Sequence, residues 1–172
     1  PADLPTHTKD APQLFFGVMA PWNRAYRRTL FTEGGIRFAT KVWYEDIRIV
    51  TKVLALAEQV VRLPGAYYHY LQREGSAMNN KNCARNVEIL YAFDDILGWF
   101  GEHGLREAYR DELTFLAISH LLIAASVRVA RIDCKSELLG QFRDYMEKNF
   151  PDFRENRYLP RLDRNKRLVY RL

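Results

Sequence analysis

Apolar residues recur every three to four positions through much of the second half of the chain, which is the spacing of amphipathic helices. The pattern predicts helices over residues 86–100, 105–132 and 136–149. Pro151 follows the last of them, and proline ends a helix because it lacks the backbone N–H and clashes with the preceding turn. We therefore expect residues 80–172 to form a helical extension that ends in a basic tail.

The first part of the chain has a mixed pattern. Helical spacing predicts one helix over residues 44–59, and a shorter one capped by Asn23. Alternating apolar residues over 36–39, and β-branched and aromatic residues over 60–71, predict short strands. The expected fold class is therefore α+β but predominantly helical, with a few short strands in residues 1–79 and a helical bundle after them.

Length and composition exclude several classes of protein for this chain. The length of 172 residues suits one domain. Only two cysteines are present, which excludes a disulfide scaffold and a four-cysteine zinc site. The longest uncharged run in the predicted long helix, 113–127, is shorter than the roughly 20 residues that span a bilayer. The first residue is Pro1 rather than Met, which we interpret as the sign of a piece of a longer protein.

A net charge of +5 favours anionic partners. Basic residues alternate with acids over most of the chain and no nucleic-acid-binding motif is present, so we do not expect a nucleic-acid partner. Seven Lys or Arg residues against three acids in the tail 151–172 leave three alternatives: a solvated segment, a contact with anionic lipid, or packing against the rest of the chain.

Two groups of residues could carry chemistry. Glu45 and Asp46 are adjacent carboxylates at a predicted helix start, where one could accept a proton from a hydroxyl nucleophile. The same pair could equally serve only to favour the helix N-terminus. Arg73 and Ser76 lie in a loop with Gly75 and offer a guanidinium and a hydroxyl that suit a pyrophosphate, although an ordinary polar turn has the same composition.

Four sequence stretches favour a chemical role for these two groups over a merely structural one: PWNRAYRR at 21–28, RF at 37–38, YED at 44–46 and AYYHYLQREGS at 66–76. Together they resemble the C-terminal half of family 2 glycosyltransferases of the GT-A fold, over about residues 20–80. The resemblance implies inverting transfer of a sugar from a nucleotide-sugar donor to the hydroxyl of a glycan or lipid-linked acceptor. The product would be a surface polysaccharide or glycan, and the enzyme would be cytoplasmic or peripheral at the inner face of the membrane.

The resemblance also implies roles for individual residues. Asp46 would be the general base and Glu45 would shape the acceptor site. The remaining matches are substrate-binding residues, namely Trp22, Asn23, Tyr70, Arg73 and Ser76. A divalent metal, Mn or Mg, is expected in the complete enzyme, and His69 is a weak candidate ligand for it.

The chain departs from the family pattern in ways that bear on activity. It contains no DxD motif, and no nucleotide-binding half precedes the matched stretches. Leu71 stands where the family pattern has an arginine. We therefore expect an acceptor-side piece that is inactive alone. The alternative is a non-catalytic helical interaction module, with homodimerisation through helices 86–149.

Overall fold

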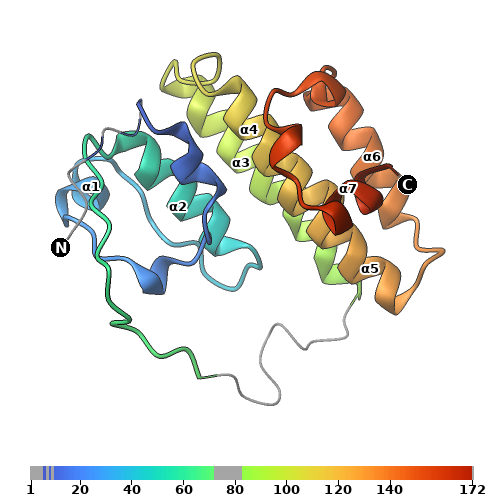
Figure 1. Cartoon of the computed structure of the whole chain (residues 1–172), viewed down its shortest axis with the longest axis horizontal. Helices are drawn as coiled ribbons and strands as arrows, with labels where there is room; N and C mark the ends of the chain where they lie inside the picture. Colours follow the sequence, from blue (N-terminus) through green and yellow to red (C-terminus); the bar gives the residue numbers. More distant parts are fainter. Residues whose placement is uncertain (1–5, 7, 9, 72–82, 172) are drawn as a thin grey trace. The chain divides into compact units, whose positions relative to one another are not determined.

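The computed structural model describes residues 6, 8, 10–71 and 83–171 (Figure 1). The chain divides into two compact units, Pro1–Lys81 and Asn82–Leu172. The described part is predominantly helical, which confirms the coarse fold class. Each unit has its own buried side chains and is described by itself.

The first unit is organised by helix α2 (Glu45–Leu56). The 3-10 turns η1 (Pro12–Phe16) and η2 (Pro21–Asn23) and the short helix α1 (Thr29–Thr32) all contact it. The buried face of α2 carries the apolar residues that helical spacing had predicted, and Phe15 of η1 is fully buried as well. The helix ends three residues earlier than expected because Ala57 adopts an extended backbone with ψ of 115°. The hydroxyl of Thr8 donates to the Ala57 carbonyl over 2.8 Å and holds this end in place.

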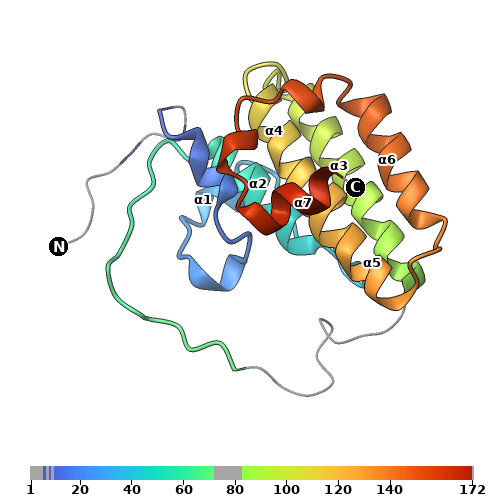
Figure 2. The ribbon, with the colours of Figure 1, turned by 45° about the vertical axis from the view of Figure 1, so that its right-hand side comes forward.

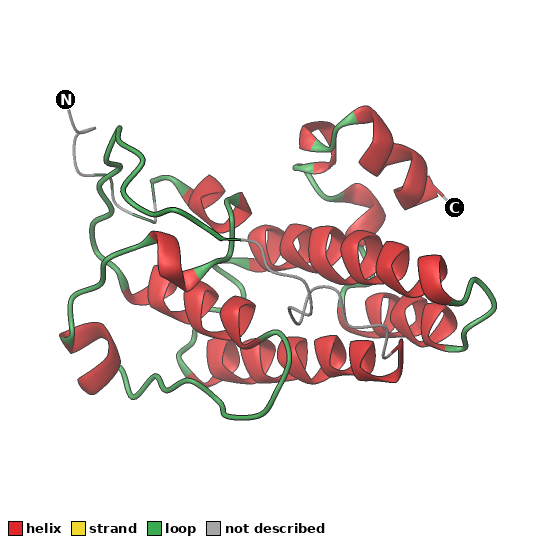
Figure 3. Ribbon diagram, turned by 90° about the horizontal axis from the view of Figure 1, so that it is seen from below, coloured by secondary structure: helices red, strands yellow, loops and turns green. Residues whose placement is uncertain are grey.

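The predicted strands are wrong for the described residues. Figure 3 draws only helices and loops, and the one bridge between extended segments joins Thr6 and Val60 in antiparallel fashion. Residues 36–39 and 61–71 are extended without a neighbouring strand. Every residue from 61 to 71 is exposed, so the β-forming composition is present but the pairing partner that a strand requires is not among the described residues. Asn23 lies in η2 instead of capping the helix, which starts only at Thr29.

The second unit is a bundle of helices. Its longer members are α3 (Glu88–Glu102), which follows the 3-10 turn η4 (Cys83–Val87), and α6 (Leu138–Asn149). Between them runs a continuous helical stretch made of α4 (Arg110–Ala117), the π-helical η5 (Ile118–Ala125) and α5 (Ser126–Ile132). The two views of Figures 1 and 2 show these three rods side by side. This confirms the helices expected over 86–149, with shifted boundaries.

The tail folds back on the same bundle. It contains the single turns η6 (Phe153–Glu155) and η7 (Leu159–Arg161) and helix α7 (Arg164–Arg171). Helix α7 contacts η5, and Phe153 and Leu162 are buried. Of the three alternatives for the tail, packing against the rest of the chain therefore holds for its inner face.

The stretch Arg110–Ile132 is the one helix in the described residues that is long and apolar enough to cross a membrane, with a mean hydropathy of 1.8 over its most apolar window. The uncharged run 113–127 alone had not predicted a helix of this length and hydropathy. More than half of that window, 56%, is buried within the protein, as in the core helix of a globular bundle. Its fully buried side chains include Leu113, Leu116 and Leu121.

A buried carboxylate ties the tail to this helix. Glu112 of α4 is 2% exposed, and its Oε1 accepts hydrogen bonds from Arg157 Nη2 over 2.9 Å and from the Tyr158 hydroxyl over 2.5 Å. Arg157 also pairs through Nε with Asp111 over 2.9 Å, and Asn156 donates to the Asp111 carbonyl over 2.8 Å. A buried carboxylate is stable only when it is paired and hydrogen-bonded, so this cluster determines where residues 156–158 lie.

We predict that Arg157→Ala lowers the free energy of unfolding by about 2 kcal/mol, because it leaves the Glu112 carboxylate buried with one donor fewer. Chemical denaturation at pH 7 measures the change. Arg131→Ala removes an exposed arginine of α5 and should change stability by less than about 0.5 kcal/mol. Equal effects of the two substitutions would show that the cluster does not hold the tail.

The fold also predicts an acid-sensitive step at His120 of η5. Burial, with smaller contributions from the nearby cations Lys166 and Arg128, lowers the pKa of His120 to about 4. The folded state therefore favours the neutral imidazole, whereas the unfolded state takes up a proton near pH 6.5. The stability that the neutral ring contributes is complete above pH 6.5 and is lost as the pH falls toward 4. We predict that His120→Gln flattens the stability profile between pH 6.5 and pH 4 by roughly 2 kcal/mol. Parallel profiles for the two proteins would contradict this prediction.

Candidate functional site

The candidate site of the first unit is the N-terminus of α2. Glu45 and Asp46 form its first turn, as the sequence predicts. Tyr44, directly before them, has φ of 63° and ψ of 26°, and Lys41 has φ of 62°. A left-handed backbone is costly for residues other than glycine, and such positions cluster where a side chain has to be aimed. The two residues turn the chain so that the carboxylate pair starts the helix.

Asp46 has an unusual environment for a carboxylate at this position. Its side chain is half-buried and forms no hydrogen bond or ion pair with any described residue. Burial raises the pKa of Asp46 to about 6, and the neighbouring Glu45 carboxylate adds to the increase. A helix N-terminus ordinarily lowers the pKa of a carboxyl group, so desolvation outweighs the helix dipole here. A pKa of about 6 makes Asp46 a stronger base than an ordinary aspartate while it remains ionised at neutral pH.

The Tyr26 side chain lies near this carboxylate. Burial raises the pKa of Tyr26, the Arg24 guanidinium lowers it, and the Asp46 carboxylate raises it again. The phenol therefore lies close enough to the carboxylate, and to the guanidinium, to interact electrostatically with each. Arg24 is oriented by a hydrogen bond from Nη1 to the Ala20 carbonyl over 3.2 Å. Both residues come from the PWNRAYRR stretch, which contacts α2 through η2.

An exposed aromatic cluster is formed by Trp22 of η2 with Tyr68 and Tyr70. The Trp22 ring stacks on Tyr70 with a centroid distance of 4.7 Å and an interplanar angle of 3°, and on Tyr68 at 4.8 Å and 28°. The three side chains are 39%, 52% and 50% exposed, so the cluster presents aromatic surface to solvent. Trp22 and Tyr70 were expected to bind substrate, and the structure brings them together. Asn23 is exposed beside them.

The remaining predicted site residues are Arg73, Ser76 and His69. Arg73 and Ser76 lie outside the described residues. His69 is exposed on the extended segment between Tyr68 and Tyr70. No group of three or more potential metal ligands exists among the residues that the structure describes, so these residues alone do not fit a metal site. The divalent metal expected of a complete enzyme stays a prediction.

Sequence reasoning missed Tyr26, Arg24 and Tyr68 as members of the site. Tyr26 was expected only as part of a short amphipathic helix, and Tyr68 as a strand residue. Their positions within the two matched stretches were a signal that could have identified them, because PWNRAYRR and AYYHYLQREGS contain all three. That Tyr26 approaches Asp46 follows only from the packing of residues 21–28 on α2.

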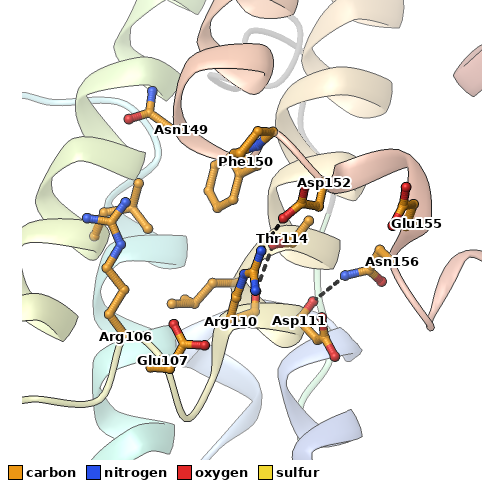
Figure 4. A pocket seen from close by; sticks show the side chains of 13 residues that line it. Arg106, Glu107, Arg110, Asp111, Thr114, Asn149, Phe150, Asp152, Glu155 and Asn156 are labelled. Carbon is orange, nitrogen blue, oxygen red and sulfur yellow. Dashed lines mark hydrogen bonds and ion pairs between the residues drawn. The ribbon is translucent and has the colours of Figure 1, made fainter.

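The second unit contains a pocket of about 460 Å³ near the start of α4 and the end of α6 (Figure 4). Most of its polar groups are already engaged with each other. Arg110 pairs with Asp152, Asn156 donates to the Asp111 carbonyl, and Thr114 donates to the Arg110 carbonyl over 2.7 Å. The charges on its wall are mixed, with two arginines and four carboxylates. This pocket is therefore part of the packing that holds the tail, and the α2 site is the better functional candidate.

Comparison with known proteins found no match: no family model, no curated protein and no solved structure matches this chain. Function is therefore inferred from the residues of the site.

The raised pKa of Asp46 has a consequence for stability that does not depend on function. The folded state favours the protonated form of Asp46, so ionisation of this carboxyl group lowers the free energy of unfolding. The loss is complete above about pH 6 and disappears as the pH falls toward 4. We predict that Asp46→Asn raises the free energy of unfolding by about 1 kcal/mol at pH 8, after allowance for solvent screening, and by nearly nothing at pH 3.5.

Denaturation of the two proteins at both pH values measures this difference. Glu33→Gln, which removes an exposed carboxylate of the same unit, serves as the control and should show no such gain. A loss of stability in Asp46→Asn at pH 8 would mean that the carboxylate is held by a partner.

Proposed function

We propose that this chain is the acceptor-binding part of an inverting glycosyltransferase, with Asp46 as the general base. The observation that carries the proposal is the half-buried Asp46 carboxylate, which has no partner among the described residues and a pKa of about 6. Structural carboxylates at helix starts are normally solvated or hydrogen-bonded, whereas a perturbed and unpaired one is typical of a proton acceptor. The similarity of four sequence stretches to family 2 glycosyltransferases supports the same assignment.

The reaction requires one proton transfer on the acceptor side. The acceptor hydroxyl oxygen attacks the anomeric carbon of the donor sugar, and a new C–O bond forms. The bond from that carbon to the nucleoside diphosphate breaks, and the diphosphate leaves with the bonding electrons. The hydroxyl proton passes to Asp46, whose raised pKa increases the driving force for this transfer. Tyr26 is the nearby phenol, and it interacts electrostatically both with the Asp46 carboxylate and with the Arg24 guanidinium.

The aromatic cluster of Trp22, Tyr68 and Tyr70 suits the binding of a sugar. One face of a pyranose ring carries C–H groups and is apolar, while its edges carry hydroxyls. Exposed aromatic faces bury such apolar surface without an unsatisfied polar group, and the tyrosine hydroxyls can bond to the sugar edges. We place the acceptor on this cluster, on the side of η2 that is open to solvent.

Donor binding belongs to parts outside the described residues. Arg73 and Ser76 are the residues of this chain that we assign to the donor pyrophosphate, as the resemblance implies. The nucleotide-binding half and its metal are assigned to the complete enzyme.

Transfer by the complete protein tests the base. We predict that Asp46→Asn, made in the longest natural form of the protein, reduces kcat at least about a thousandfold with little change in the Kd for the nucleoside diphosphate. Release of nucleoside diphosphate from a panel of nucleotide sugars, with purified glycan acceptors, measures kcat. Glu33→Gln is the control. Wild-type turnover of Asp46→Asn would overturn the assignment.

Binding by the chain itself tests the acceptor platform. The chain has three tryptophans, and incorporation of 5-fluorotryptophan gives each its own ¹⁹F NMR signal. On titration with soluble oligosaccharides we expect the Trp22 signal to shift and the Trp99 signal, from the second unit, to remain. Tyr70→Ala should weaken the response about tenfold by removing one stacking face. A Trp22 signal that no oligosaccharide shifts would remove this part of the proposal.

A second candidate function, an interaction module, is favoured by one observation. Segment 61–71 is fully exposed and carries half of the large exposed apolar side chains of the described residues: Val61, Leu63, Tyr67, Tyr68, Tyr70 and Leu71. Exposed apolar surface of this kind marks contact sites. Concentration-dependent self-association in light scattering, abolished by Leu63→Lys with Tyr67→Lys, would favour this function, whereas a monomer at all concentrations would exclude homodimerisation.

A further inference from the structure

The entire net charge of the protein lies in its last 19 residues. Residues 1–153 contain 19 basic and 19 acidic residues, whereas residues 154–172 contain seven basic residues and two acids, which equals the net charge of +5 for the whole chain. A uniformly basic protein would spread such an excess over its surface. Here the positive field comes from one segment that the Glu112 cluster and the packing of α7 on η5 hold against the bundle.

Helix α7 divides this segment into two faces. Val169 and Tyr170 are half-buried, and the Tyr170 ring meets Phe153 edge-on at 6.3 Å. Arg164, Arg167 and Leu168, three or four positions apart, lie on the opposite face and are exposed. Leu168 is 64% exposed, a large value for a leucine. The outward face therefore combines an exposed apolar side chain with neighbouring cations.

The cations of this face are available for a partner. Arg164 forms no hydrogen bond or ion pair with any described residue, and Arg167 uses Nη2 to donate to the Pro160 carbonyl over 2.7 Å, which does not neutralise its charge. Lys166 does not belong to this face, since it lies two positions from Arg164 and acts electrostatically on His120 of η5, and it is 3.8 Å from Asp163 in a loose, exposed pair. Helix α7 itself contains no acid.

We propose that the outward face of α7 docks the protein on membranes rich in anionic lipid. Arginines beside a bilayer bind the phosphate groups, and a neighbouring leucine enters the boundary between head groups and acyl chains. Nucleic acid would match the charge but would leave Leu168 in contact with phosphates, and the aromatic ring of α7 that could stack on a base, Tyr170, faces inward. The inference is independent of the proposed sugar transfer, because it uses only residues of the second unit.

Co-sedimentation of the 172-residue chain with vesicles tests the docking. The probes are vesicles of phosphatidylcholine alone and of phosphatidylcholine with about 30% phosphatidylglycerol. We expect binding only to the second kind, and a decrease of at least about tenfold when the salt concentration rises from 50 to 500 mM. Equal binding to both kinds, or to neither, would overturn the proposal.

Variants separate the face from the net charge. Arg164→Gln with Arg167→Gln removes two exposed cations and should weaken the vesicle Kd roughly twentyfold, at about fivefold for each charge. Arg131→Gln with Lys135→Gln lowers the net charge equally from exposed positions at the end of α5 and beyond it, and should weaken binding less than about threefold. Leu168→Ser should weaken it about fivefold without any change in charge.

Three results would contradict the assignment. Equal losses in the two double variants would mean that charge alone acts, and an unchanged Kd in Leu168→Ser would mean that no side chain enters the bilayer. Tighter binding to a fluorescent 20-nucleotide single strand or duplex than to the anionic vesicles, lost in Arg164→Gln with Arg167→Gln, would assign the face to nucleic acid. Circular dichroism of each variant is the control for folding, and we expect unchanged spectra because the substitutions are at exposed positions.

Discussion

The second unit depends on the need to satisfy one buried carboxylate. Glu112 lies on a helix whose neighbouring side chains are apolar, and its charge could not remain there without donors. Arg157 and Tyr158 supply them from a segment 45 residues further along the chain. Their approach brings the turns η6 and η7 onto the bundle and leads into α7. The position of the basic face of the tail therefore follows from an electrostatic requirement in the core.

Asp46 in the first unit is a carboxylate in the opposite situation, without hydrogen-bond donors from the described residues. Like Glu112 it starts a helix and is removed from bulk solvent, but no donor among the described residues meets it, and Glu45 adds a second negative charge. Its pKa rises, whereas Glu112 receives an arginine and a phenol. Two acids of one chain thus have different roles because their surroundings differ, a structural one for Glu112 and a proposed chemical one for Asp46.

The extended segment 61–71 shows why the expected strands did not form. Val61 and the tyrosines, on the two sides of Pro64 and Gly65, favour strands by their composition. A strand, however, is defined by hydrogen bonds to another strand, and among the described residues only the preceding Val60 has such a partner, at Thr6. Local pattern predicts a helix more reliably because the hydrogen bonds of a helix lie within the segment itself. The helices over 86–149 were accordingly predicted with errors of a few residues at their ends, and the strands were not.

Several features of this protein were determined by the sequence alone. Helical spacing determined the bundle of the second unit, and the adjacency of Glu45 and Asp46 placed both in the first turn of α2, because these relations connect residues within about four positions. The sequence also contained the charge imbalance of the tail. The tertiary structure alone decided that Tyr26 lies near Asp46, that Trp22 stacks on Tyr68 and Tyr70, and that Glu112 binds Arg157. These contacts join residues that are 20 to almost 50 positions apart, and burial and packing, which no local pattern encodes, select them.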